Sequence, residues 1–267
     1  MLIAQISDMH VKPPGQQLYD RIDTAGYLER AVAHLLTLDP APDIVIATGD
    51  LINDGTLAEY ERLRRLLAPL PMPIYVIPGN HDARDTLRAG FADHAYLPKS
   101  GFLQYAIEGL PVRLLALDTL VPGKGHGGLC DERLDWLEAR LNEQTDKPTA
   151  IFMHHPPFAC GIEAVDKEGL REGRSRLAEL VRRHDNVERI MCGHVHRPIQ
   201  MRWAGTMASI APSTAHQATL DLHEGASLSM MMEPPGIALH YWTPAAGLVT
   251  HLSYIGAFDG PKPFRAL

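Results

Sequence analysis

Short apolar runs alternate with amphipathic segments through most of the chain. The apolar runs are rich in Val, Ile and Leu, as is typical of strands buried on both faces of a sheet, and they lie at Leu2–Ile6, Ile44–Thr48, Ile74–Ile77, Leu103–Ile107, Val112–Leu117, Thr149–Met153 and Arg189–Cys192. Helical spacing of apolar residues predicts helices between them, at Thr24–Leu38, Leu57–Leu67, Glu132–Gln144 and Leu170–Arg183. Thr56 and Glu59 predict a capping box at the start of the second helix. This alternation is typical of an α/β fold.

The C-terminal part of the chain has a different pattern. Gln200–Ile210 and Ile237–Ile255 predict strands without intervening helices. Between them, Met230–Met232 fits either a core position or a contact between subunits, because methionine packs adaptably. We therefore expect a core over 1–217, a cap or oligomerisation hairpin over 218–240, and final strands with a tail over 241–267. A homo-oligomer, dimeric or higher, is expected through this hairpin.

Five polar turns, each after a predicted strand, contain most of the candidate chemistry. They are D-x-H at Asp8–His10, G-D at Gly49–Asp50, G-N-H-D at Gly79–Asp82, H-H-P-P at His154–Pro157 and G-H-x-H at Gly193–His196. The carboxyl ends of strands in an open α/β sheet meet at one edge, so these turns should converge. Carboxylate oxygens and imidazole nitrogens are ligands for divalent metal ions. The pattern as a whole predicts a centre for two metal ions.

Some ligand roles follow from the residues themselves. Asp8 and His10, two positions apart, can reach the same ion. Asp50 is the only acid in its turn and is the natural bridging carboxylate, which holds two ions about 3.5–4 Å apart in two-metal hydrolases. His154 and His155 compete for one position, because alternation along an extended chain points the two rings in opposite directions.

The five motifs also support a family resemblance. Together with Leu18–Asp23, the I-P-G-N-H-D and I-F-M-H-H-P-P runs and Ser213–Gln217, they make the chain resemble the calcineurin-like metallophosphoesterase superfamily. Within it, the chain is similar to bacterial bimetallic glycerophosphodiesterases and class III cyclic nucleotide phosphodiesterases. The resemblance weakens after about residue 217. It implies a four-layer α/β/β/α sandwich, in which helices flank two mixed β-sheets.

The resemblance also implies which residues bind the metals. The first ion would be bound by Asp8, His10, Asp50 and His196. The second ion would be bound by Asp50, Asn80, His154 and His194. His154 is then the expected ligand of the pair, and His155 is expected either behind the ligands, supporting them without binding metal, or in the substrate cleft. The ions would be iron, manganese, cobalt or zinc, all of which imidazole–carboxylate sites accept.

Other residues are expected to act on the substrate. His81, next to the ligand Asn80, is interpreted as a general acid for the departing alkoxide or as a cation that stabilises the transition state. Asn80 belongs to the same catalytic group. His216 is interpreted either as a substrate-binding residue in the cleft or as a surface histidine. Asp82 is interpreted as structural.

The sequence around Asp50 bears on the substrate. Related protein phosphatases have G-D-x-x-D-R-G, whereas this chain has G-D-L-I-N-D-G at Gly49–Gly55. A phosphomonoester benefits from an additional arginine because it has nearly two negative charges, so the absence of this arginine favours diesters. We expect glycerophosphodiesters, 3',5'-cyclic nucleotides or both as substrates. The alternatives are a phosphomonoesterase and a non-catalytic metal-binding module, and the complete set of ligands together with His81 argues against the second.

Composition limits the partners. The 267 residues have a net charge of −7, which argues against a nucleic acid polymer as partner. No segment approaches the roughly 20 apolar residues of a membrane helix, so no membrane partner is expected. The three cysteines have no disulfide-like spacing, and Met1 leads directly into a predicted strand. The expected compartment is therefore the cytoplasm.

Overall fold

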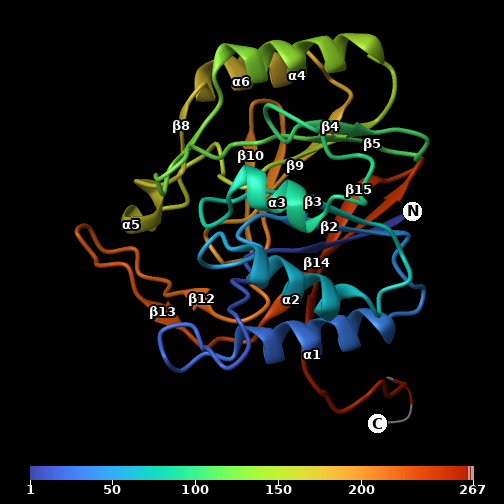
Figure 1. Cartoon of the computed structure of the whole chain (residues 1–267). Helices are drawn as coiled ribbons and strands as arrows, with labels where there is room; N and C mark the ends of the chain where they lie inside the picture. The colour runs from blue at the N-terminus through green and yellow to red at the C-terminus, as the bar shows by residue number, and fades with distance from the viewer. Residues whose placement is uncertain (264, 266–267) are drawn as a thin grey trace.

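Two β-sheets pack face to face between layers of helices (Figure 1). The computed structural model describes residues 1–263 and 265. The first sheet has the order β15–β14–β1–β2–β3, and its strands are β1 Leu2–Ile6, β2 Ile44–Thr48, β3 Ile74–Ile77, β14 Gly236–Thr243 and β15 Gly247–Tyr254. The second has the order β10–β11–β9–β7–β5–β4, and its strands are β4 Tyr105–Ile107, β5 Arg113–Ala116, β7 Thr149–Phe152, β9 Val187–Cys192, β10 Ile199–Trp203 and β11 Thr206–Ile210.

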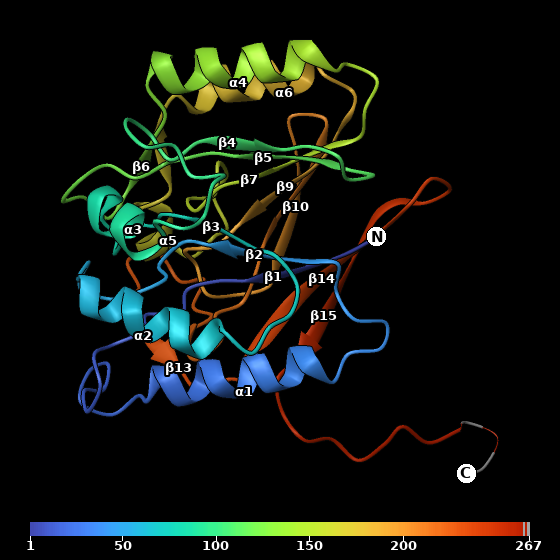
Figure 2. The ribbon, with the colours of Figure 1, turned by 45° about the vertical axis from the view of Figure 1, so that its right-hand side comes forward.

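The helices form the outer layers. They are α1 Thr24–Leu36, α2 Leu57–Leu67, α3 Arg84–Gly90, α4 Asp131–Glu143, α5 Glu163–Asp166 and α6 Arg174–Arg182. In Figure 2, α1 and α2 cover the first sheet, and α4 and α6 cover the second. Both sheets combine parallel and antiparallel pairs. The predicted four-layer α/β/β/α sandwich is confirmed.

The sheets are held together by apolar packing and by buried polar side chains, of which Gln5 lies near the predicted metal turns. A single core cluster includes Ile3 and Ile6 of the first sheet and Phe152 and Met191 of the second. Gln5 is fully buried, and its Nε2 donates to Thr48 Oγ1 at 2.9 Å and to the Cys192 carbonyl at 2.8 Å. The ends of β1, β2 and β9 are thereby held together, and three of the predicted metal turns begin at these ends.

The predicted helix over Leu170–Arg183 is wrong at its start. The segment Leu170–Glu172 is the short strand β8, which pairs with β6 at Gly127–Gly128. Helix α6 begins only after Gly173, which has φ +76°, a left-handed conformation that glycine adopts easily. The prediction extended the helix across this break because it relied on the spacing of apolar residues alone.

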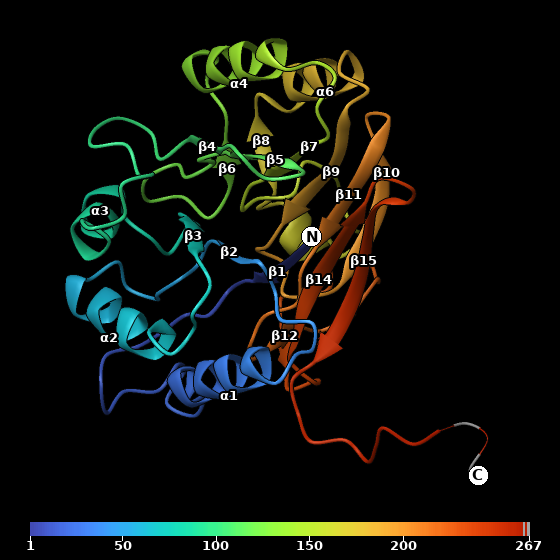
Figure 3. The ribbon, with the colours of Figure 1, turned by 90° about the vertical axis from the view of Figure 1, so that its right-hand side faces the viewer.

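The C-terminal segment forms two hairpins. The first contains β12 Gln217–Ala218 and β13 Met230–Met231, and we call residues 217–231 the β12–β13 hairpin. The second, β14–β15, lies at the edge of the first sheet (Figure 3), where residues 238–241 of β14 pair with β1. Residues 264, 266 and 267 of the expected tail lie outside the described residues.

Among residues 1–263 and 265, the structure contains no helix with the length and apolar character needed to cross a bilayer.

Candidate metal centre

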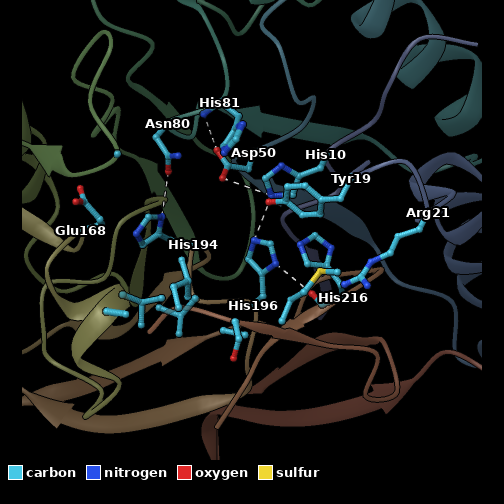
Figure 4. Close-up of a pocket in the computed structure, with 18 residues that line it drawn as sticks. His10, Tyr19, Arg21, Asp50, Asn80, His81, Glu168, His194, His196 and His216 are labelled. Atoms are coloured by element: carbon cyan, nitrogen blue, oxygen red, sulfur yellow. Dashed lines mark hydrogen bonds and ion pairs between the residues drawn. The ribbon is translucent and has the colours of Figure 1, made fainter. Parts of the chain in front are cut away.

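The five polar turns converge at one edge of the two sheets, as the sequence predicts. Figure 4 shows His10, Asp50, Asn80 and His196 together at this edge. The donor atoms of four residues lie within 4.8 Å of one another: Asp8, His10, Asp50 and His196. In this first group, His10 Nε2 lies 3.2 Å from His196 Nε2. Asp8 Oδ1 lies 3.3 Å from His196 Nε2, and Asp50 Oδ2 lies 3.6 Å from His10 Nε2.

A second group lies on the other side of Asp50. Asn80 Oδ1 is 3.1 Å from His154 Nε2 and 3.0 Å from His194 Nδ1. Asp50 Oδ1 is 3.4 Å from His154 Nε2. One oxygen of Asp50 therefore faces each group, which is the arrangement that a bridging carboxylate requires.

The donor atoms in both groups fit bound cations. Imidazole nitrogens that face one another gain nothing from direct contact unless a proton or a cation lies between them. The outer nitrogens are held by the protein: His154 Nδ1 donates to the Thr48 carbonyl at 2.7 Å, and His196 Nδ1 donates to the His216 carbonyl at 3.1 Å. Such bonds fix the ring orientation and leave Nε2 free for a metal. The carboxylate, amide and imidazole donors suit divalent transition metals.

Backbone conformation marks the same residues independently of the motifs. Asp8, His10, Asp50, His194 and His196 all have positive φ, between 44° and 74°. Such conformations are uncommon for residues other than glycine, cost free energy and concentrate at functional sites. The strain lies at five of the seven predicted ligands.

A cavity of about 480 Å³ lies over the two groups. His81 and His216 both line it. His81 Nδ1 donates to the Asn53 carbonyl at 2.8 Å, so its Nε2 remains available on the cavity side. The His216 ring centroid lies 4.7 Å from that of His196 and 5.6 Å from that of His10. Of the two interpretations of His216, the structure places it in the cleft.

His155 lies beneath the cavity rather than in its wall. It is fully buried, although its donor atoms fall within 4.8 Å of those of His154 and His194. Its Nδ1 is 2.8 Å from Thr119 Oγ1, and its Nε2 donates to the Gly125 carbonyl at 3.0 Å. Of the two positions considered for His155, the structure has the one behind the ligands, where protein partners occupy both ring nitrogens.

Three residues of the cavity wall were missed by sequence reasoning. Tyr19 and Arg21 come from the turn between Leu18 and Ile22, and Glu168 follows α5. None belongs to a metal motif. The only sequence signal was that Leu18–Asp23 shares in the family resemblance, which pointed to the segment but not to a role.

The sequence model of the family described as "Calcineurin-like phosphoesterase" matches residues 1–198. The chain belongs to this family.

Relatives of this calcineurin-like phosphoesterase match along nearly the whole chain. "Probable glycerophosphodiester phosphodiesterase GpdQ" from Arcobacter nitrofigilis is 42% identical over 99% of this chain and 97% of its own length. "3',5'-cyclic adenosine monophosphate phosphodiesterase CpdA" from Pseudomonas aeruginosa is 30% identical over 81% of this chain and 77% of its own length. A dimetal phosphatase from Danio rerio shares the fold, with a TM-score of 0.69, 15% identity and coverage of 96% and 99% of the two chains.

Gly49 provides a test of how tightly this calcineurin-like site is packed. It has φ +87°, and a Cβ there would lie 2.4 Å from His154 Nδ1 and 2.8 Å from the Gly79 backbone nitrogen. Gly49→Ala should lower the free energy of unfolding by about 3 kcal/mol, because backbone strain and overpacking add. Gly15→Ala is the matched control, since Gly15 has φ +79° with nothing within 4 Å, and it should cost only about 1 kcal/mol. Equal losses in urea denaturation would contradict the packing argument.

The charge on His154 predicts a proton release when metal binds. Burial disfavours a charge on this ring, but the Asp50 carboxylate outweighs burial and raises the pKa of His154 to about 9. Burial and the charge of His154 lower the pKa of His194 to about 3. At pH 7 the metal-free protein therefore holds a proton on His154 that a metal must displace.

Titration calorimetry of metal into the metal-free protein, in buffers of different ionisation enthalpy, should detect proton release at pH 7. His154 contributes to this release, and so does His196, because the Asp8 carboxylate outweighs burial and raises the pKa of His196 as well. The release should disappear as the pH rises through 9. By the same linkage, the stabilisation of the metal-free fold by His154 is complete below the ordinary pKa of 6.5 and is lost as the pH rises toward 9. An observed enthalpy that is independent of the buffer at pH 7 would contradict the assignment.

Proposed function

We propose that this protein is a metal-dependent phosphodiesterase that hydrolyses small phosphodiesters, namely glycerophosphodiesters, 3',5'-cyclic nucleotides or both. The observation that carries the proposal is the pair of donor groups that share Asp50 beneath a cavity lined by His81. The names of the relatives agree with it, since they are glycerophosphodiester and cyclic nucleotide phosphodiesterases.

Each donor group would hold one divalent ion. Asp8, His10, Asp50 and His196 would hold the first ion. Asp50, Asn80, His154 and His194 would hold the second. When bound, such ions supply a Lewis acid for the phosphoryl oxygens and lower the pKa of a water ligand. Iron, manganese, cobalt and zinc are the proposed candidates, because carboxylate and imidazole ligands suit all four.

The surrounding residues would position the diester and handle its leaving group. His81 would protonate the departing alkoxide from Nε2, or stabilise its charge as a cation, while its Nδ1 stays bonded to the Asn53 carbonyl. Asn80 would contribute to the same step through its amide. His216, next to His10 and His196, would contact the substrate. His155 would position the Gly125 loop through its hydrogen bond to that carbonyl.

A phosphomonoesterase is the alternative. The arginine that protein phosphatases place after the bridging aspartate is absent here, but Arg21 lines the cavity from another segment. A monoester has nearly twice the charge of a diester and would profit from this guanidinium.

Initial rates separate the two activities. Protein reconstituted with manganese should hydrolyse bis(p-nitrophenyl) phosphate much faster than p-nitrophenyl phosphate. A preference for the monoester would overturn the diesterase assignment. Rates at background level for both substrates, with two metals bound per chain, would indicate the non-catalytic metal-binding module instead.

The division into a core over 1–217, a cap or oligomerisation hairpin over 218–240 and final strands over 241–267 is part of the proposal. It is supported by exposed apolar side chains on and beside the β12–β13 hairpin, which are Leu220, Leu222, Leu228, Met231 and Met232. Met230 instead packs against Leu18 and Ile22. Exposed apolar surface of this kind is typical of subunit contacts, so we expect a homo-oligomer, which sedimentation velocity would detect.

The free thiols of Cys130, Cys160 and Cys192 support a reducing compartment such as the cytoplasm.

A further inference from the structure

The cavity has charges of opposite sign at its two ends. Glu168 lies on the side of Asn80 and His194, and Arg21 lies on the side of His216 (Figure 4). The metal groups and His81 lie between them. Neither charged residue belongs to the metal centre, so both are available to contact the two alcohol groups of a bound diester.

Glu168 lines the cavity next to the loop that contains Gly125. A Cβ on Gly125 would lie 3.0 Å from Glu168 Oε2, so the carboxylate lies directly over Gly125. The carbonyl of Gly125 in turn accepts from His155, whose ring centroid is 4.7 Å from that of His194. The Gly125 loop therefore lies between the carboxylate and His155, which packs beside His194.

The charge of Glu168 is only weakly paired. Its Oε1 forms an exposed ion pair with Arg171 NH2 at 3.7 Å, a distance too long for a hydrogen bond, and exposed pairs of this kind contribute little. Arg171 donates instead through Nε and NH2 to the Lys167 carbonyl. Around the carboxylate, Ala164, Val165 and Leu228 add apolar wall to the cavity. An anionic group next to apolar surface suits an alkylammonium group, whose charge and methylene carbons need different neighbours.

The backbone that holds Arg21 is well ordered by hydrogen bonds at the opposite end of the cavity. The turn that contains Arg21 is closed by reciprocal hydrogen bonds of 2.9 Å between the backbones of Leu18 and Ile22. Leu18 and Ile22 are buried against Ala215, next to His216. A guanidinium at this end repels a cation, and it can donate hydrogen bonds to hydroxyl, carboxylate or phosphate oxygens.

We propose that Glu168 forms an ammonium-binding subsite, and that Arg21 sets the direction in which the diester lies. The preferred substrates are then diesters in which one alcohol has an alkylammonium group, in preference to cyclic nucleotides. This inference rests on the proposed phosphodiesterase function.

The test compares two chromogenic diesters with the same leaving group. p-Nitrophenyl phosphorylcholine has a trimethylammonium group, and ethyl p-nitrophenyl phosphate has none. The quantity measured is the ratio of kcat/KM for the first substrate to kcat/KM for the second. Glu168→Gln should lower this ratio about fivefold, the size expected when a partly exposed charge pair is lost.

Three further measurements make the test specific. Glu179→Gln removes an exposed carboxylate on α6, away from the cavity wall, and should leave the ratio unchanged. Arg21→Gln should raise the ratio or leave it unchanged. High salt should lower the wild-type ratio toward that of Glu168→Gln, because salt screens exposed charges.

The possible failures are distinguishable. Equal losses on both substrates in Glu168→Gln, or a ratio that falls in Arg21→Gln, would overturn the subsite while leaving the phosphodiesterase function intact. If the wild-type protein with bound manganese hydrolyses neither diester, the proposed function itself fails.

Discussion

Asp50→Asn should empty both metal positions and lower turnover on the order of 10³-fold, as loss of a group that stabilises transition-state charge does. The reason is the geometry of the carboxylate, since Oδ2 faces His10 at 3.6 Å and Oδ1 faces His154 at 3.4 Å. An amide has one oxygen and no charge, so it cannot bridge two cations. Metal content after dialysis, measured by mass spectrometry, should fall from two ions per chain to fewer than one.

The substitution isolates the charge, because the backbone tolerates it. Asp50 has φ 47°, and asparagine adopts this left-handed conformation readily. Asp54→Asn is the matched control: this carboxylate is half-exposed beside Lys12 and lies outside the cavity wall, so both metals and turnover should be retained. One position emptying while the other stays full would disprove the bridging role.

The sequence predicts the strands better than the connections between them, for a physical reason. The predicted bounds of β1, β2 and β3 match the structure, because strands that are largely buried give nearly continuous apolar runs. The ligand turns could be predicted for a related reason, since the α/β topology brings the carboxyl ends of strands together. The match of the family to residues 1–198 agrees with both.

The features that could not be predicted from the sequence depend on contacts between segments that are distant in the chain. Strands β6 and β8 are two and three residues long and exist because they pair with one another, so neither has a pattern of its own. Arg21 and Glu168 meet the same cavity from opposite sides of the fold. The burial of His155 depends on Thr119 and Gly125, which lie some thirty residues away in the chain. Only the folded chain shows which polar residues reach a cavity.

His81→Ala should keep both metals and lower turnover by about 10²–10⁴-fold, the range for loss of a general acid. The metals should stay because the link from this residue to Asp50 is through its backbone: His81 N donates to Asp50 Oδ1 at 2.9 Å. Removing the ring leaves that bond intact. It takes away the Nε2 that faces the cavity, together with the Nδ1 hydrogen bond to the Asn53 carbonyl.

A comparison of substrates with different leaving groups distinguishes the two roles considered for His81. Nitrophenolate is weakly basic and departs without a proton, whereas the alkoxide of a glycerol ester needs one. If His81 is a general acid, His81→Ala should therefore affect glycerophosphocholine far more than bis(p-nitrophenyl) phosphate. Equal losses on the two substrates would identify the ring as a cation that stabilises charge on the phosphoryl group, because that contribution does not depend on the basicity of the leaving oxygen. Unchanged turnover, or metal lost together with activity, would contradict both roles and show that the ring is structural.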